Sequence, residues 1–287
     1  MTFFGARYPI IQAPMAYVQP PSLAAVVSSA GAIGSIAGAP LSPDELRSAI
    51  RLVRASTDGP FAVNLFAAPY LRAGQLEVVL EEQPPIFSFT FGVVDPAPLQ
   101  ATGISVLGTA TNAEEAAVLE QAGVDAVVAQ GLEAGGHRGT FLGSFEESLV
   151  PLHDLLRSVD VSVPVVAAGG IVDGEGVRHA LDLGAAAAQI GTAFLFAPEC
   201  GTAPEHLAAL RTYDTVVTPA YTGRHMRAAR TPLLAELMAG PPPLPYPEQR
   251  AAVAYRGPVF MGGTSARRAR ELPAAELVET LAAEAGL

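Results

Sequence analysis

Residues 124–140 read VDAVVAQGLEAGGHRGT, and the rest of the chain can be interpreted from this stretch. It begins with an apolar run, Val124–Ala129, that is typical of a buried strand. A polar, glycine-rich segment with Gln130, His137 and Arg138 follows at once. In α/β proteins the loops that leave the strands usually carry the chemistry. The stretch therefore predicts an α/β fold with functional groups just beyond a strand end.

Apolar runs alternate with amphipathic stretches along most of the chain. The runs predicted as strands are Pro9–Ala13, Ala32–Ile36, Phe61–Leu65, Ile86–Thr90, Ile104–Leu107, Val124–Ala129, Val163–Ala168 and Ala186–Ile190. Helices are predicted between them, and two helix starts are well marked, at Ser42-Pro43-Asp44-Glu45 and at Thr111-Asn112-Ala113-Glu114-Glu115. Eight such βα units predict a (β/α)8 TIM barrel. A doubly wound open sheet is the alternative, although no G-x-G-x-x-G motif follows the first strand.

The chain becomes rich in proline from Pro219 onward, with GPPPLPYP at residues 240–247. Two or three helical patches lie between these segments. We expect residues 1–218 to form the barrel. Residues 219–287 are expected to pack on it as a small helical cap that is not an independent domain.

Composition excludes several classes of function. The 287 residues carry a formal net charge of -11, which disfavours binding to nucleic acid or to an anionic membrane. The 17 basic residues are all arginine, so Schiff-base chemistry and a P-loop lysine are excluded. Cys200 is the only cysteine, and no spaced set of His, Asp and Glu predicts a metal site. Because no segment resembles a signal peptide or a membrane span, we expect a cytoplasmic protein.

Glycines follow the last two predicted strands. Gly169 and Gly170 come after one of them, and Gly191 and Thr192 come after the other. In a barrel these two loops usually bind phosphate, because glycine lets backbone N–H groups approach it closely. The sequence therefore predicts a phosphate-binding site at the C-terminal ends of the strands.

Two side-chain amides, Asn64 and Gln130, lie at the ends of other predicted strands. An amide offers both a donor and an acceptor, which suits the carbonyl and N–H edge of a flavin. Together with the glycine loops, these amides predict FMN as the cofactor. His137 is the candidate catalytic base, because an imidazole titrates near neutrality and the residue directly follows a barrel strand.

These motifs resemble the nitronate monooxygenase family, formerly called 2-nitropropane dioxygenases. QGLEAGGHRG at residues 130–139 is the most specific part of the match, which runs from the first strand to Thr222-Gly223-Arg224 and Arg227 and, more loosely, to Pro245-Tyr246-Pro247. The resemblance implies that FMN is held by Ala13, Pro14, Met15, Asn64, Gln130, Gly135, Gly170, Gly191 and Thr192, to which the glycine-loop argument adds Gly169. It implies that His137 removes the proton α to a nitro group. The flavin would then pass electrons to O2, and a carbonyl compound and nitrite would be released.

The E-A-G-G-H-x-G run is shared with FMN-dependent enoyl-ACP reductases and with flavin NADH:quinone reductases. Gln130 favours the monooxygenase branch, because the enoyl reductases have glutamate there. Gly263 stands where the family commonly has glutamine, and the loops after the third and fourth strands are short. The substrate therefore stays open among propionate 3-nitronate, a quinone and an intermediate of a biosynthetic pathway. A flavin-binding protein without enzyme activity is a further alternative, and a homodimer is also left open.

Overall fold

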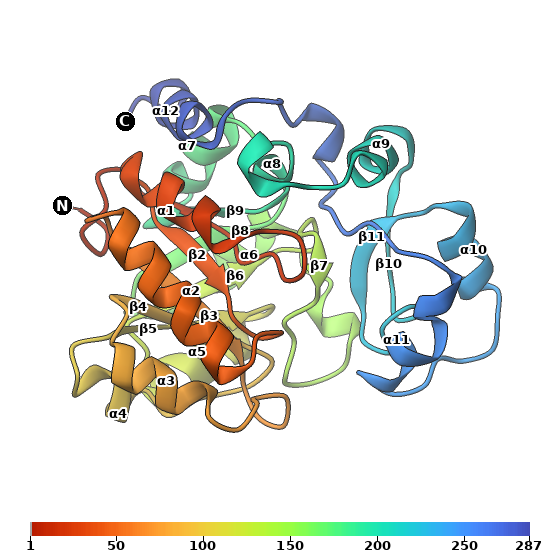
Figure 1. Cartoon of the computed structure of the whole chain (residues 1–287), viewed down its shortest axis with the longest axis horizontal. Helices are drawn as coiled ribbons and strands as arrows, with labels where there is room; N and C mark the ends of the chain where they lie inside the picture. Colours follow the sequence, from red (N-terminus) through yellow and green to blue (C-terminus); the bar gives the residue numbers. More distant parts are fainter. Residues whose placement is uncertain (1) are drawn as a thin grey trace.

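The computed structural model describes residues 2–287, and its centre is a closed barrel of eight parallel strands (Figure 1). Their order around the barrel is β1 (Ile10–Gln12), β9 (Ala187–Ile190), β8 (Val165–Ala168), β6 (Ala126–Gln130), β5 (Ser105–Ala110), β4 (Ile86–Thr90), β3 (Phe61–Phe66) and β2 (Gly34–Ala37). Two hydrogen bonds close the ring. Gln12 N–H donates to the carbonyl of Ile33 (2.8 Å), and Ile33 N–H donates to the carbonyl of Ile10 (2.9 Å). Each predicted strand overlaps one of these eight, so the predicted (β/α)8 barrel is confirmed over the open sheet.

Helices cover the outside of the barrel. They are α1 (Pro21–Ser29), α2 (Pro43–Ser56), α3 (Gln75–Glu82), α4 (Ala97–Gln100), α5 (Ala113–Ala122), α6 (Leu152–Ser158), α7 (Gly174–Asp182), α8 (Thr192–Leu195) and α9 (Pro204–Thr212). The two predicted helix starts are confirmed. Ser42 Oγ accepts from Glu45 N–H (3.3 Å) while the Glu45 carboxylate accepts from Ser42 N–H (2.7 Å), and Asn112 Oδ1 accepts from Glu115 N–H (2.8 Å).

Both faces of the barrel strands are buried. Ile11, Ile33 and Leu107 point into one apolar cluster inside the barrel, whereas Phe87 and Phe89 belong to a second cluster that packs against the helices. Strands that are buried on both faces have nearly continuous apolar sequences, which is why they stand out in this chain.

The C-terminal part contains two features that the sequence did not indicate. β10 (Thr215–Thr218) and β11 (Met226–Ala229) form an antiparallel sheet with β7 (Gly136–His137) from the loop after β6. With α10 (Pro232–Met238) and α11 (Glu248–Val253), residues 215–257 make a small unit beside the barrel, called here the antiparallel lobe (Figure 1). The strands are short, and β7 comes from a distant part of the chain, so no local pattern predicts this sheet.

The last helix, α12 (Ala274–Glu284), returns to the barrel, where it packs against α1 and α7 (Figure 1). Leu277, Val278 and Leu281 on its inner face are at most 1% exposed. The C-terminal segment thus completes the ring of helices as well as forming the lobe. Among the helices of residues 2–287, none has the length and apolar character needed to cross a membrane.

Candidate active site

The C-terminal ends of the strands bring most of the predicted cofactor residues to one face of the barrel. Ala13 N–H donates to the carbonyl of Ile190 (2.8 Å), which sets the end of β1 beside the end of β9. A methyl group placed on Gly191 would lie 3.3 Å from Cβ of Ala13 and 3.8 Å from Sδ of Met15. Pro14 connects those two residues. The loops after β1 and β9 therefore touch one another.

The Gly169-Gly170 loop after β8 lies against the loop that follows β6. Both glycines have positive φ angles, +119° and +75°. A Cβ on Gly169 would lie 2.9 Å from the backbone nitrogen of Ala134, and one on Gly170 would lie 3.0 Å from Cβ of Glu133. Only glycine adopts this backbone easily in so little space.

This geometry fits a phosphate group. Throughout the part of the chain that the structure describes, the backbone N–H groups of Gly170 and Gly191 have no protein acceptor. Free N–H groups on close-packed glycine backbone are what a phosphate requires. The glycine loops could therefore hold the phosphate of a flavin nucleotide.

The segment before α12 forms a wall against these loops. The sequence singled it out only as a departure from the family. Gly263 N–H donates to Thr192 Oγ1 (2.9 Å), and Thr264 N–H donates to the carbonyl of Glu133 (3.1 Å). A Cβ on Gly263 would lie 2.8 Å from that carbonyl, and one on Gly135 would lie 2.5 Å from the carbonyl carbon of Gly262. The glycine at 263 therefore allows this segment to close against the loop after β6.

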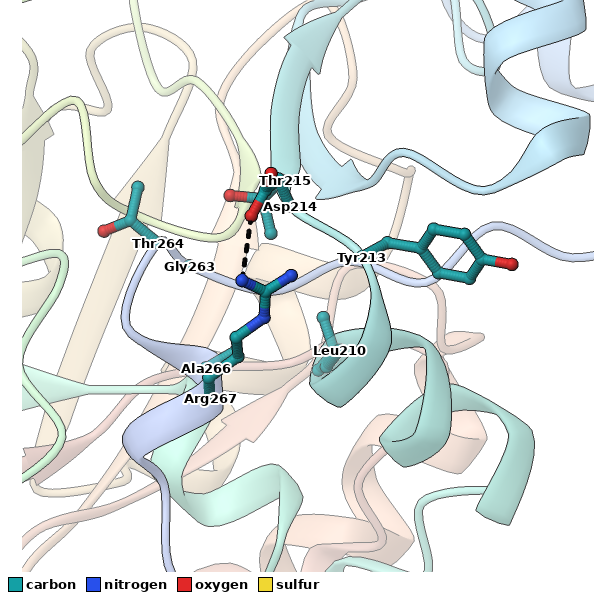
Figure 2. Close-up of a pocket in the computed structure, with 8 residues that line it drawn as sticks. All are labelled: Leu210, Tyr213, Asp214, Thr215, Gly263, Thr264, Ala266 and Arg267. Atoms are coloured by element: carbon teal, nitrogen blue, oxygen red, sulfur yellow. Dashed lines mark ion pairs between the residues drawn. The ribbon is translucent and has the colours of Figure 1, made fainter.

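Outside this wall is a cavity of about 180 Å³ (Figure 2). It is lined by Leu210, Tyr213, Asp214, Thr215, Gly263, Thr264, Ala266 and Arg267. An ion pair of 3.1 Å between Arg267 and Asp214 spans it, although both side chains are largely exposed. Gly263 belongs to both the cavity and the wall, so the cavity adjoins the predicted cofactor face.

The two predicted amides have different surroundings. Asn64 Nδ2 donates to Ser88 Oγ (3.0 Å), and no donor within residues 2–287 reaches its Oδ1. Gln130 Nε2 donates to the carbonyl of His137 (3.1 Å), while Gln130 Oε1 accepts from Gly139 N–H (2.8 Å). Gln130 therefore fixes the loop that carries His137, and one N–H and one lone pair of its amide are left for a ligand.

Arg138, which was not singled out from the sequence as a site residue, also anchors the loop that carries His137. It is 1% exposed, and its guanidinium donates to the carbonyls of Gly131 (2.6 Å), Gln130 (2.9 Å) and Ser148 (2.7 Å). Burial lowers the pKa of this guanidinium to about 10, so it stays charged at neutral pH. A charged donor to three carbonyls holds the backbone on both sides of His137 in place, at residues 130–131 and at Ser148.

His137 lies where the loop pairs with the antiparallel lobe, opposite Met226 in β11. Its Nε2 is 3.1 Å from Thr222 Oγ1. The ring meets Phe91 and Tyr246 edge to face, with centroids 5.9 and 5.5 Å away. Tyr70 continues this aromatic wall, 5.0 Å from the ring of Tyr246. The imidazole is therefore enclosed by barrel loops on one side and by the lobe on the other.

The predicted base is uncharged in this environment. Burial, with smaller contributions from the positive charges of Arg224 and Arg250, lowers the pKa of His137 to about 3. A neutral imidazole keeps one nitrogen lone pair, so the ring is in its unprotonated form above that range, and the low pKa makes it a weak base. His137 is thus a neutral ring on the loop that packs against the Gly169-Gly170 segment.

Arg224 brings a positive charge to the aromatic wall. Its guanidinium carbon is 3.9 Å from the centroid of Phe91, and the group donates to the carbonyls of Thr140 and Arg138. No carboxylate within the described residues forms an ion pair with it. The sequence marked Arg224 only through the family resemblance, because its guanidinium contacts residues more than 80 positions away.

The other titratable candidates take no part in this arrangement. His206 is buried and its Nε2 lies 2.8 Å from the carbonyl of Met261, while His225 stacks on Phe145. His153 and His179 stack on each other between α6 and α7. Burial raises the pKa of the Cys200 thiol, which disfavours a nucleophilic thiolate. Within residues 2–287, no three His, Cys, Asp or Glu side chains are grouped as a metal site.

Comparison with known proteins agrees with this geometry. The sequence model of the nitronate monooxygenase family matches residues 1–73 and 68–284. The nitronate monooxygenase of Pseudomonas aeruginosa is 41% identical, over 98% of this chain and 97% of its own length, and that of Paraburkholderia phytofirmans is 38% identical over 99% and 94%. The alignment with the Pseudomonas protein spans 339 positions, more than the 287 residues here, so the relative has insertions that this chain lacks.

Solved structures give the same picture. Nitroalkane oxidase from Streptomyces ansochromogenes superposes with a TM-score of 0.91 at 37% identity, covering 98% of this chain and 96% of that one. FabK from Thermotoga maritima superposes with a TM-score of 0.80 at 32% identity, covering 98% and 93%. The fold, the site and these similarities agree, and the chain belongs to the nitronate monooxygenase family of flavin-dependent enzymes.

Proposed function

We propose that this protein is an FMN-dependent enzyme that oxidises nitronates with O2 to a carbonyl compound and nitrite. It would also accept nitroalkanes after removing their α proton. The observation that carries the proposal is that the loop after β6, which bears His137, packs against the Gly169-Gly170 loop and, through Gly263, against Thr192. The family match and the similarity to a nitroalkane oxidase support the same substrate class.

The residues proposed to hold FMN divide into three groups. Gly169, Gly170, Gly191 and Thr192 would bind the phosphate through backbone N–H groups and one hydroxyl. Asn64 and Gln130 would hydrogen-bond the flavin ring through the groups that the protein leaves free. Ala13, Pro14, Met15 and Gly135 would line the cofactor with backbone and small or flexible side chains. FMN is proposed over FAD because the glycine loops suggest a single phosphate cradle and the sequence has no dinucleotide fingerprint.

The protein's own groups account for the proton chemistry. His137 would take the α proton of a nitroalkane, and the electron pair of the broken C–H bond would remain on the substrate as the nitronate. Phe91, Tyr70 and Tyr246 would exclude water from the reacting carbon. When bound, FMN would supply the redox chemistry that links oxidation of the nitronate to reduction of O2.

The proposal is tested by replacing the base. A nitroalkane must lose its α proton before electrons leave it, whereas a nitronate has already lost this proton. His137→Asn should keep its FMN and should lower kcat/KM with nitroalkanes by about 10²-fold, with a smaller loss for nitronates. An equal loss for both substrates with FMN still bound would show that His137 is not the base. Absence of activity in the wild type with either substrate would remove the proposed function itself.

A second candidate is an FMN-dependent NAD(P)H reductase, which the similarity to FabK keeps open. Anaerobic mixing separates the two functions. We expect propionate 3-nitronate to reduce the flavin faster than NADH or NADPH does. Rapid reduction by a pyridine nucleotide, with no reduction by nitronates, would establish the reductase instead.

A further inference from the structure

His137, Thr222 and Arg224 form a closed set of hydrogen bonds that decides where the proton of the imidazole lies. Thr222 Oγ1 is 2.7 Å from the carbonyl oxygen of Arg224, 3.3 Å from the backbone nitrogen of Arg224 and 3.1 Å from Nε2 of His137. Thr222 is 2% exposed, so water does not compete freely for these bonds. The hydroxyl therefore has three protein partners and one hydrogen to share among them.

The donor in each pair follows from the chemistry of the groups. A carbonyl oxygen only accepts, so the Thr222 hydroxyl must donate its hydrogen to the carbonyl of Arg224. The backbone N–H of Arg224 only donates, and it uses one lone pair of the Thr222 oxygen. The other lone pair is left for His137, so Nε2 must carry a hydrogen and donate it to Thr222.

The second ring nitrogen is left free. Nδ1 of His137 has no hydrogen-bond partner among residues 2–287. In that part of the chain the side-chain nitrogen and oxygen atoms that are both buried and unpartnered are Arg138 Nε and Thr202 Oγ1. Nδ1 is therefore open to small molecules, and in the Nε2–H tautomer it holds the basic lone pair.

We propose that Thr222 is a positioning residue that holds His137 in the Nε2–H tautomer, so that Nδ1 is the atom that accepts the substrate proton. The role rests on the proposed function of His137 as the base. In the step itself the α C–H bond breaks, the proton goes to Nδ1, and the electron pair stays on the substrate as a nitronate. No electrons leave the substrate in this step, and the imidazolium that forms still donates from Nε2 to Thr222.

The tautomer can be observed directly on the flavin-loaded enzyme. In protein labelled with ¹⁵N-histidine, long-range ¹H–¹⁵N correlation spectra at pH 7 distinguish a protonated ring nitrogen from an unprotonated one. Comparison with His137→Asn assigns the signals among the five histidines. We expect Nε2 protonated and Nδ1 unprotonated. A protonated Nδ1 in the wild type would overturn the proposal, whatever the enzyme's substrate.

The role of Thr222 is tested with two variants of different chemistry. Thr222→Val keeps the shape but removes the hydroxyl, and its His137 signals should move toward a mixture of tautomers. Thr222→Ser keeps the hydroxyl and should keep the wild-type spectrum. If the spectrum of Thr222→Val is unchanged, Thr222 does not set the tautomer and the proposal fails.

The kinetic effects of the two Thr222 variants should parallel their spectra. With a nitroalkane, Thr222→Val should lower kcat about 10-fold or more at nearly unchanged KM, because Thr222 acts through the imidazole. Nitronate oxidation should change less, and Thr222→Ser should be close to wild type. An equal loss for both substrates in Thr222→Val would mean that the role is structural. If the wild type oxidises neither substrate the proposed function fails, while the spectra still decide the tautomer.

Discussion

The barrel and the antiparallel lobe make different contributions to one site. In the barrel, β5 and β6 bury all but one residue each, and the glycines at positions 169, 170 and 191 form the proposed phosphate cradle from backbone. In the lobe, β10 buries only Thr218, and the lobe contributes the side chains of Thr222, Arg224 and Tyr246 around His137. The proposed cofactor site is thus built from backbone, whereas the surroundings of the proposed base are built from side chains that are exchanged more easily. Substitutions that change the substrate range are therefore expected in the lobe rather than in the barrel.

The largest effect should come from blocking the barrel's glycine loop. Gly170→Val places a branched side chain at φ +75° where a Cβ already lies 3.0 Å from Cβ of Glu133. We expect an almost complete loss of flavin, because the backbone can no longer approach the phosphate. The ratio of flavin to protein after purification, from the absorbance spectrum, measures this loss.

Gly184→Val is the matched control. Gly184 also has a positive φ angle (+96°), but a Cβ there would have no heavy atom within 4 Å. It therefore carries a similar backbone strain without the crowding. Retained flavin in Gly184→Val and lost flavin in Gly170→Val would assign the effect to the cradle. Normal flavin content in Gly170→Val would show that the phosphate binds elsewhere.

The barrel was predictable from the sequence because its cues are local. A strand that is buried on both faces is an apolar run, and the helix cap at Ser42 occupies four consecutive residues. Strand ends in a barrel share one face, so the residues that follow the apolar runs are expected to lie together even though they are far apart in the chain. The positions of the glycine loops follow from this rule alone.

The surroundings of His137 were not predictable in the same way. Thr222 is 85 positions from His137 in sequence, and it reaches the imidazole only because β7 pairs with β11. Phe91 faces the ring from a backbone with φ of +77°, which no local pattern requires of phenylalanine. Gln130 was expected to face the flavin, and the structure shows that its amide also holds the loop. The candidate residues could be identified from the sequence, but the side chains that surround them could be identified only from the structure.

A second, smaller effect should appear in the pH dependence of stability. The pKa of a histidine in the unfolded chain is about 6.5, whereas burial lowers that of His137 to about 3. Between these values the unfolded chain binds a proton that the folded chain does not. The free energy of unfolding should therefore fall as the pH is lowered from 6.5, and His137→Asn should reduce this slope.

Urea unfolding of the wild type and His137→Asn at several pH values between 7 and 4 measures the difference. Burial also lowers the pKa values of His206 and His225, so the wild type alone would not identify the residue. Equal slopes in the two proteins would show that His137 titrates normally. In that case the rate with nitroalkanes should rise between pH 5 and 8, whereas a low pKa predicts no such rise from His137.

The smallest effect should come from the outer shell of the barrel, far from both the cradle and the lobe. Ser42 and Glu45 satisfy each other's backbone N–H groups at the start of α2, and removing the Ser42 hydroxyl leaves the Glu45 N–H without its acceptor. Ser42→Ala should therefore lower the free energy of unfolding by about 1 kcal/mol. Ser48 lies in the same helix and is also partly exposed, but its hydroxyl only donates back to the carbonyl of Asp44 (2.8 Å). Ser48→Ala should cost little or nothing, because such a bond within a helix is not needed for its stability. Neither variant should change flavin content or kcat. Loss of flavin in Ser42→Ala would show that the cradle is sensitive to the helices outside it, and the separation of roles between barrel and lobe would then be too simple.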